Sequence, residues 1–94
     1  MKIYIAGKIT GLKNYKKVFN KKEKELIKQG YTVMNPSILP CGFTHKEYMR
    51  ICFSMIYACD YVYMLSNWKQ SEGAMMEFEY AKQRDKIIFI ESED

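Results

Sequence analysis

The sequence predicts an α/β fold in which a mainly parallel sheet of about four strands carries helices on both faces. Short runs rich in β-branched and aromatic residues alternate with longer stretches whose apolar residues recur at helical spacing. A helical stretch follows each of the first three strand-like runs, and strands joined by helical crossovers are parallel. The 94 residues leave room for one hydrophobic core, so residues 1–94 are expected to form a single domain.

The first half of the chain supplies two of the strands and one helix. Residues 2–6 are a short β-rich run that ends at a glycine, as a buried strand does. A helix is expected from an N-cap at Asn14 to a stop at Gly30, and residues 31–34 predict the second strand. Residues 37–43 read as a loop, because they contain a proline and a glycine.

The second helix begins at Thr44, which has capping-box spacing to Glu47. Residues 46–58 are apolar on nearly every side of this helix, which indicates burial on every side. In so small a domain, the second buried face is expected to meet another copy of the chain. We therefore predict a homo-oligomer, a dimer or higher, formed through the apolar helix 46–58.

The second half of the chain completes the sheet. Residues 60–65 predict the third strand, a third helix runs from a cap at Ser71 to about Arg84, and residues 86–90 predict the last strand. Asp60 starts its strand, at the edge of the sheet away from the expected site, and is interpreted as structural.

Cysteine usage and hydropathy exclude several classes of protein. The three cysteines are odd in number and lack CxxC spacing, which favours a reducing, cytoplasmic setting. His45 is the only histidine, so a Cys/His zinc site lacks ligands, and we expect no metal and no cofactor. No stretch approaches the ~18 apolar residues of a membrane span, so no membrane partner is expected.

The net charge of +4 comes from one segment, residues 14–29, where six lysines stand against two glutamates. Such a segment is either a nucleic-acid patch or a solvated helix face. The lysines are mixed with glutamates and no arginine is among them, which favours the solvated face. A nucleic-acid partner is therefore not expected.

Parallel sheets of this kind bind ligands at the carboxyl ends of their strands, which draws the third helix into a candidate site. Ser71 lies at the start of that helix, where its hydroxyl and the N–H groups can hold an anion. Gly73 lets a ligand approach the backbone closely. Glu77 follows about 9 Å along the axis, at ~1.5 Å per residue. That is roughly the distance from the 5′-phosphate of a nucleotide to its anomeric carbon, which a carboxylate can attack. Alternatively, Ser71 only caps the helix and Glu77 is a surface residue.

The first loop, Gly7-Lys8-Ile9-Thr10-Gly11, is a glycine-bounded turn directly after a strand and is placed to cradle phosphate or sugar. It lacks the spacing of a P-loop, and an ordinary strand exit is the alternative.

Two aromatic residues are further candidates. Trp68 lies in a polar loop near the expected mouth, where it could stack on a base or simply be exposed. Tyr4 lies inside the first strand, where a core role is more common than a ligand contact.

Three motifs resemble the nucleoside 2-deoxyribosyltransferase-like superfamily, above all its short bacterial and phage branch of unknown function. They are Tyr4-Ile-Ala-Gly7, Cys59-Asp60-Tyr-Val-Tyr and Ser71-x-Gly-Ala-x-x-Glu77-x-x-Tyr80-Ala81. The resemblance implies a Rossmann-like, flavodoxin-type three-layer sandwich. It also implies that Glu77 is the nucleophile that attacks the deoxyribose anomeric carbon and releases the base, with Tyr4 close to it. In the related deoxynucleoside-monophosphate N-glycosidases, a serine matching Ser71 and the first loop hold the 5′-phosphate.

The expected function is therefore cleavage of the N-glycosidic bond of a deoxynucleoside or its monophosphate, as a deoxyribosyltransferase or N-glycosidase. The expected catalytic residues are Glu77 and Tyr4, and the expected substrate-binding residues are Gly7, Lys8, Ile9, Thr10, Trp68, Ser71 and Gly73.

Departures from the family pattern favour an alternative, a non-catalytic nucleotide-binding module that acts as a sensor or sponge. Characterised members carry an aspartate on the second helix, in a place that falls near Cys52 here. Lys8 stands where the family often has proline or serine. The chain is also shorter than the transferases, whose C-terminal extension completes a neighbouring subunit's site.

Overall fold

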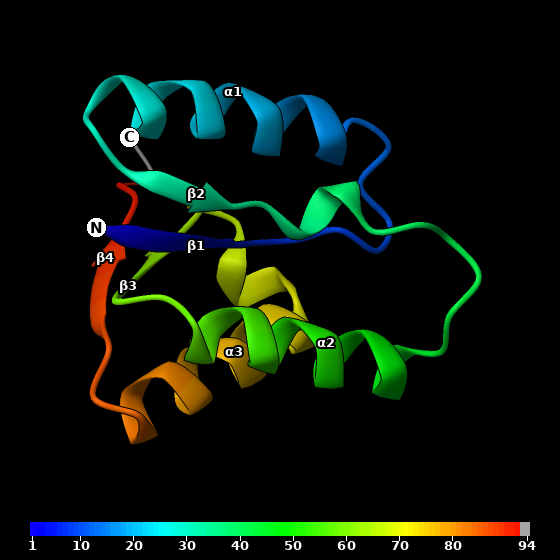
Figure 1. Ribbon diagram of the computed structural model, residues 1–94. Helices are drawn as coiled ribbons and strands as arrows, with labels where there is room; N and C mark the ends of the chain where they lie inside the picture. The colour runs from blue at the N-terminus through cyan, green and yellow to red at the C-terminus, as the bar shows by residue number, and fades with distance from the viewer. Residues whose placement is uncertain (93–94) are drawn as a thin grey trace.

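The computed structural model describes residues 1–92 and has the element order that the sequence predicts (Figure 1). The strands are β1 (Lys2–Ala6), β2 (Thr32–Met34), β3 (Tyr61–Met64) and β4 (Ile87–Ile90). The helices are α1 (Tyr15–Lys28), α2 (His45–Tyr57) and α3 (Glu72–Gln83), with short 3₁₀ turns η1 (Pro36–Ile38) and η2 (Trp68–Gln70) in the two segments expected to be loops.

The four strands form one parallel sheet in the order β2-β1-β3-β4. Tyr4 in β1 pairs with Met34 of β2 on one side and Val62 of β3 on the other. The chain moves outward from β1 to β2 and then crosses back to β3, so the strand order reverses beside β1. This is the flavodoxin-type order, and the predicted α/β Rossmann-like fold is confirmed.

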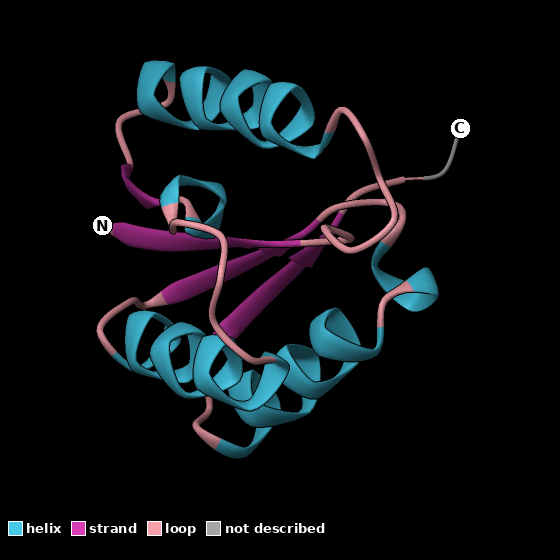
Figure 2. Ribbon diagram, turned by 90° about the vertical axis from the view of Figure 1, so that its right-hand side faces the viewer, coloured by secondary structure: helices cyan, strands magenta, loops and turns pink. Residues whose placement is uncertain are grey.

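Helices cover both faces of the sheet, with the strands between two helical layers in Figure 2. Alternate residues of β1 point to opposite faces. Ile3 and Ile5 belong to a core cluster that includes Phe19 of α1. Tyr4 and Ala6 belong to the cluster on the other face, which α2 and α3 cover.

The helix ends follow the predicted signals, with one exception. Thr44 and Glu47 form a complete capping box, and Gly30, with φ +98°, follows the end of α1. Asn14 occupies the N-cap position of α1, but its side chain accepts no capping hydrogen bond, contrary to its expected role. Its backbone conformation, φ −100° and ψ 25°, is not the extended one that capping side chains need.

The apolar helix 46–58 packs mainly against α3 of the same chain. Its buried residues, Met49, Cys52 and Ile56, recur at helical spacing, and Phe53 stacks on Tyr80 of α3 with ring centroids 4.5 Å apart. Much of the apolar surface of this helix is thus buried within the chain.

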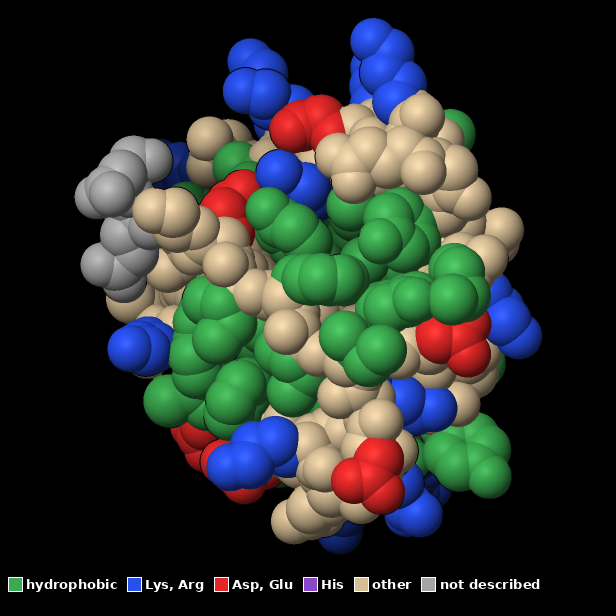
Figure 3. All heavy atoms as spheres, turned by 90° about the vertical axis from the view of Figure 1, so that its left-hand side faces the viewer, with side chains coloured by type: hydrophobic (Ala, Val, Ile, Leu, Met, Phe, Trp, Pro, Cys, Tyr) green, Lys and Arg blue, Asp and Glu red, His purple; other side chains and the backbone are tan. Residues whose placement is uncertain are grey.

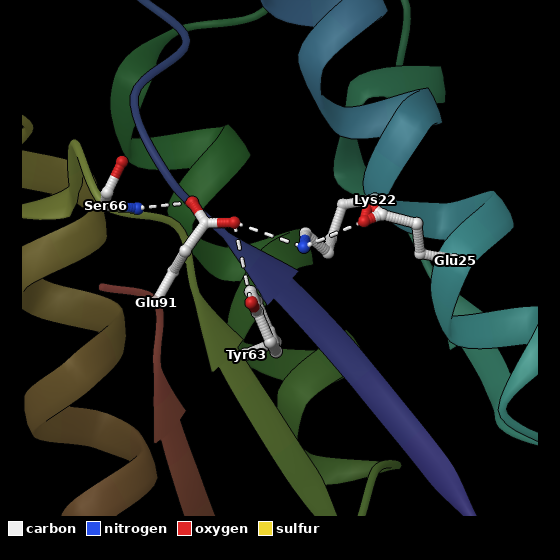
Figure 4. Close-up of polar contacts among 5 residues, drawn as sticks. All are labelled: Lys22, Glu25, Tyr63, Ser66 and Glu91. Atoms are coloured by element: carbon white, nitrogen blue, oxygen red, sulfur yellow. Dashed lines mark hydrogen bonds and ion pairs between the residues drawn. The ribbon is translucent and has the colours of Figure 1, made fainter. Parts of the chain in front are cut away.

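A polar network ties α1 to the end of the sheet (Figure 4). Lys22 contacts Glu91 at 3.1 Å and Glu25 at 3.3 Å, and the Ser66 N–H donates to Glu91 at 3.0 Å. Burial alone would raise the pKa of Glu91, but the Ser66 N–H and the Lys22 ammonium lower it overall. These contacts fix the segment after β4 beside the loop after β3.

The exposed apolar surface lies partly on the edge strand β4, on the face that Figure 3 shows. Ile87, Phe89 and Ile90 are 54%, 40% and 56% exposed. Within residues 1–92, no helix has the length and hydropathy needed to cross a membrane.

Candidate active site

A cavity of about 320 Å³ opens at the carboxyl edge of the sheet. It lies between the loop after β1, the segment that leads from η1 into α2, and the first turns of α2 and α3. Figure 2 shows that segment passing in front of the strands on its way to α2. The cavity is lined by Gly7, Ile9, Thr10, Tyr15, Pro36, Leu39, Cys41, His45, Tyr48, Met49, Cys52, Ser71, Gly73, Ala74 and Glu77.

Glu77 lines this cavity although the residue is only 6% exposed. The hydroxyl of Tyr4, which is fully buried in β1, donates a hydrogen bond to Glu77 Oε2 at 2.6 Å. The Cys52 thiol of α2 lies beside the Glu77 carboxyl and acts to lower its pKa. The expected proximity of Tyr4 and Glu77 is present, and the carboxyl group has neighbours on a strand and on a second helix.

The surroundings of Glu77 set its ionisation. Burial raises the pKa of Glu77 from 4.5 to about 7, although the hydrogen bond from Tyr4 and the nearby Cys52 thiol favour the carboxylate. Burial and the charge of Glu77 raise the pKa of the Cys52 thiol to about 12, so the thiol stays protonated at neutral pH. A carboxyl group with such a pKa can serve near pH 7 as a nucleophile when ionised or as an acid when protonated.

Ser71 lies at the other end of the cavity and caps α3. Its Oγ accepts a hydrogen bond from the Ala74 N–H at 3.1 Å. The N–H groups of Glu72 and Gly73 point out of the same helix end without intrahelical partners. Ser71 and Glu77 thus face one cavity from one helix.

The two predicted glycines have packing roles in addition to lining the cavity. A Cβ at position 7 would lie 2.6 Å from the Leu65 side chain. A Cβ at position 73 would lie 3.3 Å from Met49 Sδ and 3.6 Å from His45 Cε1. Side chains of α2 therefore occupy much of the space next to Gly73. The sequence had suggested that this space was left open for a ligand.

The first loop contributes unevenly to the cavity. Gly7, Ile9 and Thr10 line it, whereas Lys8 does not. The backbone N–H of Lys8 donates to Asn67 Oδ1 at 3.0 Å, which joins the loop after β1 to the loop after β3.

The ring of Trp68 does not reach the cavity, so the geometry does not support its expected role in base stacking. It stacks on Phe78 of α3, with ring centroids 4.7 Å apart.

The helix α2 forms one side of the cavity, which the sequence did not predict. His45, Tyr48 and Met49 line the cavity, and Cys52, noted from the sequence only as a departure, lies against Glu77. The capping box at Thr44 was a usable signal. It locates the start of α2, and a helix that follows β2 begins near the carboxyl edge of the sheet.

Comparisons with known proteins agree with this fold. The chain resembles the solved structure of a 2-desoxiribosyltransferase from Leishmania mexicana, with a TM-score of 0.77 and 20% identity. The match covers 99% of this chain but 65% of that chain, and a likeness at this identity shows the fold alone. No curated protein matches the chain. Residues 1–90 match the family model described as Domain of unknown function (DUF4406), and the chain belongs to this family.

Proposed function

We propose that the chain binds a 2′-deoxynucleoside or its 5′-monophosphate in this cavity and cleaves the N-glycosidic bond, with Glu77 as nucleophile. One observation carries the proposal: a buried carboxyl group, held by Tyr4 at 2.6 Å, faces the cavity that the N-terminus of its own helix also lines. The shared fold of the Leishmania mexicana 2-desoxiribosyltransferase supports the reaction class.

In the proposed reaction, an oxygen of the Glu77 carboxylate attacks the anomeric carbon of the sugar. A bond forms between that oxygen and C1′, and the bond from C1′ to the base nitrogen breaks. The electron pair leaves with the base, which takes up a proton from solvent, and the proton is returned to solvent when water or a second base attacks. Attack by water on C1′ then frees the sugar and restores the carboxylate, whereas attack by a second base gives a new nucleoside.

Tyr4 acts in this scheme through Glu77. Its hydroxyl has no exposed surface and binds Oε2, so Oε1 is the oxygen that attacks. Ser71, Gly73 and the backbone of the first loop, including Thr10, anchor the sugar or its phosphate at the rim of the cavity.

Release of free base is the direct test. The protein is incubated with the four deoxynucleosides and their 5′-monophosphates, and free base is separated by chromatography. Glu77→Gln should lower the rate about a thousandfold or more. Glu79→Gln is the matched control, because Glu79 lies on the same helix, is exposed and does not line the cavity. No release by the wild type, or equal rates for the wild type and Glu77→Gln, would refute the proposal.

A nucleotide-binding module without turnover is the second candidate, and Cys52 favours it. The protonated thiol stands against Glu77 where the resemblance expects an acidic residue. A ligand at 100 times its Kd should add about 2.7 kcal/mol of stability. Stabilisation without free base supports this candidate, whereas free base, or no stabilisation by any nucleotide, argues against it.

We also propose that the chain forms a homo-oligomer through the apolar helix 46–58. Phe53 of this helix packs inside the chain, but Tyr57 at its end is 63% exposed. Burial of this aromatic ring against a second copy is the stabilising contribution expected.

A further inference from the structure

The strand β4 forms one edge of the sheet and carries no feature that prevents another strand from pairing with it. Its sequence is Ile87-Ile88-Phe89-Ile90, without a charged residue or a proline, and its register with β3 has no bulge. Exposed edge strands usually carry lysine, proline or a bulge that blocks pairing with another chain. At the opposite edge, β2 has only three residues, and a very short edge strand is itself a protection. β4 is therefore the edge at which a further strand can add.

The backbone of β4 offers hydrogen-bonding groups to such a strand. The N–H of Glu91, directly after β4, donates to Met64 O of β3 at 2.8 Å. Backbone groups of successive residues point to opposite sides of a strand, so residues 87 and 89 also face β3. The N–H and C=O groups of Ile88 and Ile90 point away from the sheet, on the side where no strand of residues 1–92 pairs with β4.

The side chains of β4 are exposed because the helix on one face of the sheet lies over other strands. α1 packs on β1 and β2. A helix is about 10 Å wide and strands lie about 4.8 Å apart, so a single helix covers about two strands. Phe89, which stacks on Tyr61 of β3, and Ile87 point to this face and stay exposed. Figure 3 shows hydrophobic side chains gathered over a broad area of the surface.

We propose that two copies of the chain pair through their β4 strands, antiparallel about a two-fold axis at Phe89, so that the two sheets become one. Ile88 of each copy then lies opposite Ile90 of the other. Both residues direct their N–H and C=O groups outward, so each such pair exchanges both hydrogen bonds. Phe89 lies opposite Phe89 of the second copy, in a non-hydrogen-bonded pair that brings the side chains close. This inference goes beyond the proposed function and does not depend on it.

Tyr57 at the end of α2 extends this surface. Lys86 precedes β4, and its Nζ donates to Tyr57 O at 3.0 Å and lies 5.5 Å from the centroid of the Tyr57 ring. Tyr57, through which α2 is proposed to meet a second copy, thus lies beside the start of β4. The two contacts belong to one continuous surface, but separate substitutions test them.

Three properties of this surface favour a second copy over an unrelated peptide. The residues opposed within β4 are apolar in both copies, so no charge is buried. The edges of the joined sheet are the two short β2 strands, so the assembly closes as a dimer. The exposed parts of Ile87, Phe89, Ile90 and Tyr57 amount to roughly 400 Å² per copy. With the backbone of the edge, this area approaches the ~600 Å² per copy at the lower end of specific interfaces.

Disulfide trapping tests the register of the pairing. Cys41 is first replaced by serine, because it is exposed, whereas Cys52 and Cys59 are buried. In this background, Phe89→Cys places two thiols on opposed residues whose Cα atoms are about 4.5 Å apart, within the ~4.4–6.8 Å range of disulfides. Mild oxidation should convert most of the protein into a covalent dimer. Ile87→Cys is the matched control on the same strand and face, because its two copies are displaced by about 13 Å, too far for a disulfide.

Sedimentation measures the contribution of the backbone. Ile90→Pro removes an outward N–H and leaves the hydrogen bonds to β3, which residues 87, 89 and 91 make. The pairing loses a hydrogen bond from each copy, so the Kd of the dimer should rise about tenfold or more. Ile90→Val keeps the N–H and should leave the Kd unchanged. Circular dichroism shows whether Ile90→Pro is folded, and the trapping experiment does not depend on this variant.

Trapping and sedimentation together decide between pairing through β4, contact through α2 and no dimer. A covalent dimer from Phe89→Cys alone, with a weaker dimer for Ile90→Pro, supports the proposal. A monomeric wild type overturns it, as does a Phe89→Cys variant that traps no better than Ile87→Cys. An oligomer that Tyr57→Lys dissociates and a folded Ile90→Pro does not would assign the contact to α2 and overturn pairing through β4. None of these results bears on base release, so this proposal and the proposed function fall separately.

Discussion

The hydroxyl of Tyr4 donates a 2.6 Å hydrogen bond to Oε2 of Glu77 and so links the central strand to the third helix across 73 positions of sequence. Both groups are buried, and no buried polar side-chain atom of residues 1–92 lacks a partner. A hydrogen bond to a buried carboxylate favours its ionised form. Tyr4 therefore helps to orient Glu77 and, against the effect of burial, lowers the pH at which it ionises.

Replacement of Tyr4 by phenylalanine should raise the pKa of Glu77 above about 7. The variant loses a hydrogen bond that lowers this pKa, while the burial that raises it stays. A hydrogen bond to a charged group is worth about 1.5–3 kcal/mol, so we expect an increase of about one to two units. Base release requires the carboxylate, so the acidic limb of kcat/KM should move to higher pH by the same amount. The pH–rate profile of Tyr4→Phe beside the wild type measures this shift.

Tyr63→Phe is the control for that experiment. Tyr63 lies on the neighbouring strand, and its hydroxyl contacts Glu91, at 3.5 Å, and not Glu77. Its profile should match the wild type. A Tyr4→Phe profile that falls in height without moving along the pH axis would contradict a role in the ionisation of Glu77.

Glu77→Gln should make the protein more stable above neutral pH. The pKa of Glu77 is about 7 in the folded protein and 4.5 without its surroundings, so the folded state binds more protons between these values. The free energy of unfolding contributed by Glu77 is therefore fully present below about pH 4.5 and is lost as the pH rises through about 7. At about 1.4 kcal/mol per pKa unit, the loss of stability reaches about 3 kcal/mol. A glutamine at this position does not titrate, so the variant does not lose this stability.

Urea denaturation of wild type and Glu77→Gln at pH 5 and pH 8 measures this effect. The stability difference between the two proteins should shift in favour of the variant by up to about 3 kcal/mol at the higher pH. Glu79→Gln, on the exposed side of α3, should show little change. A difference that is the same at both pH values would mean that Glu77 does not titrate in this range.

Gly7→Ala should destabilise the fold by about 1–3 kcal/mol. The added Cβ would lie 2.6 Å from Cδ1 and 3.0 Å from Cβ of Leu65, which is itself 2% exposed and has little room to move. Thermal unfolding measures the cost. The same substitution in a Leu65→Ala background should cost less, and equal costs in both backgrounds would rule out this contact as the cause.

Sedimentation at micromolar concentration should show a mass greater than that of one chain. The exposed ring of Tyr57 is the group expected to be buried between copies, so Tyr57→Lys should shift the population toward the monomer. Ile27→Lys alters an exposed apolar residue of α1 and should leave the mass unchanged. A strict monomer for the wild type would refute the proposed interface.

Local signals predicted the elements because each depends on neighbours in sequence. Thr44 and Glu47 form the capping box that begins α2. Gly30 follows the end of α1 with a positive φ, which a glycine adopts readily. Trp68 shows the opposite case. Its position in a polar loop suggested a side chain free to contact a ligand. In the structure its ring stacks on Phe78 of α3, a contact that depends on how the helix packs.

The sequence by itself determined the alternation of strands and helices, the cap at Ser71 and the spacing from Ser71 to Glu77, since these follow from backbone geometry over a few residues. The tertiary structure alone decided that Glu77 lines a cavity and is buried, that Cys52 lies beside it, and that His45 lines the same cavity. The proximity of Tyr4 to Glu77 was expected from the family resemblance, not from any local pattern. The physical reason is that these contacts form between strand and helix or between two helices. They depend on how α2 and α3 lie on the sheet, which no local pattern encodes.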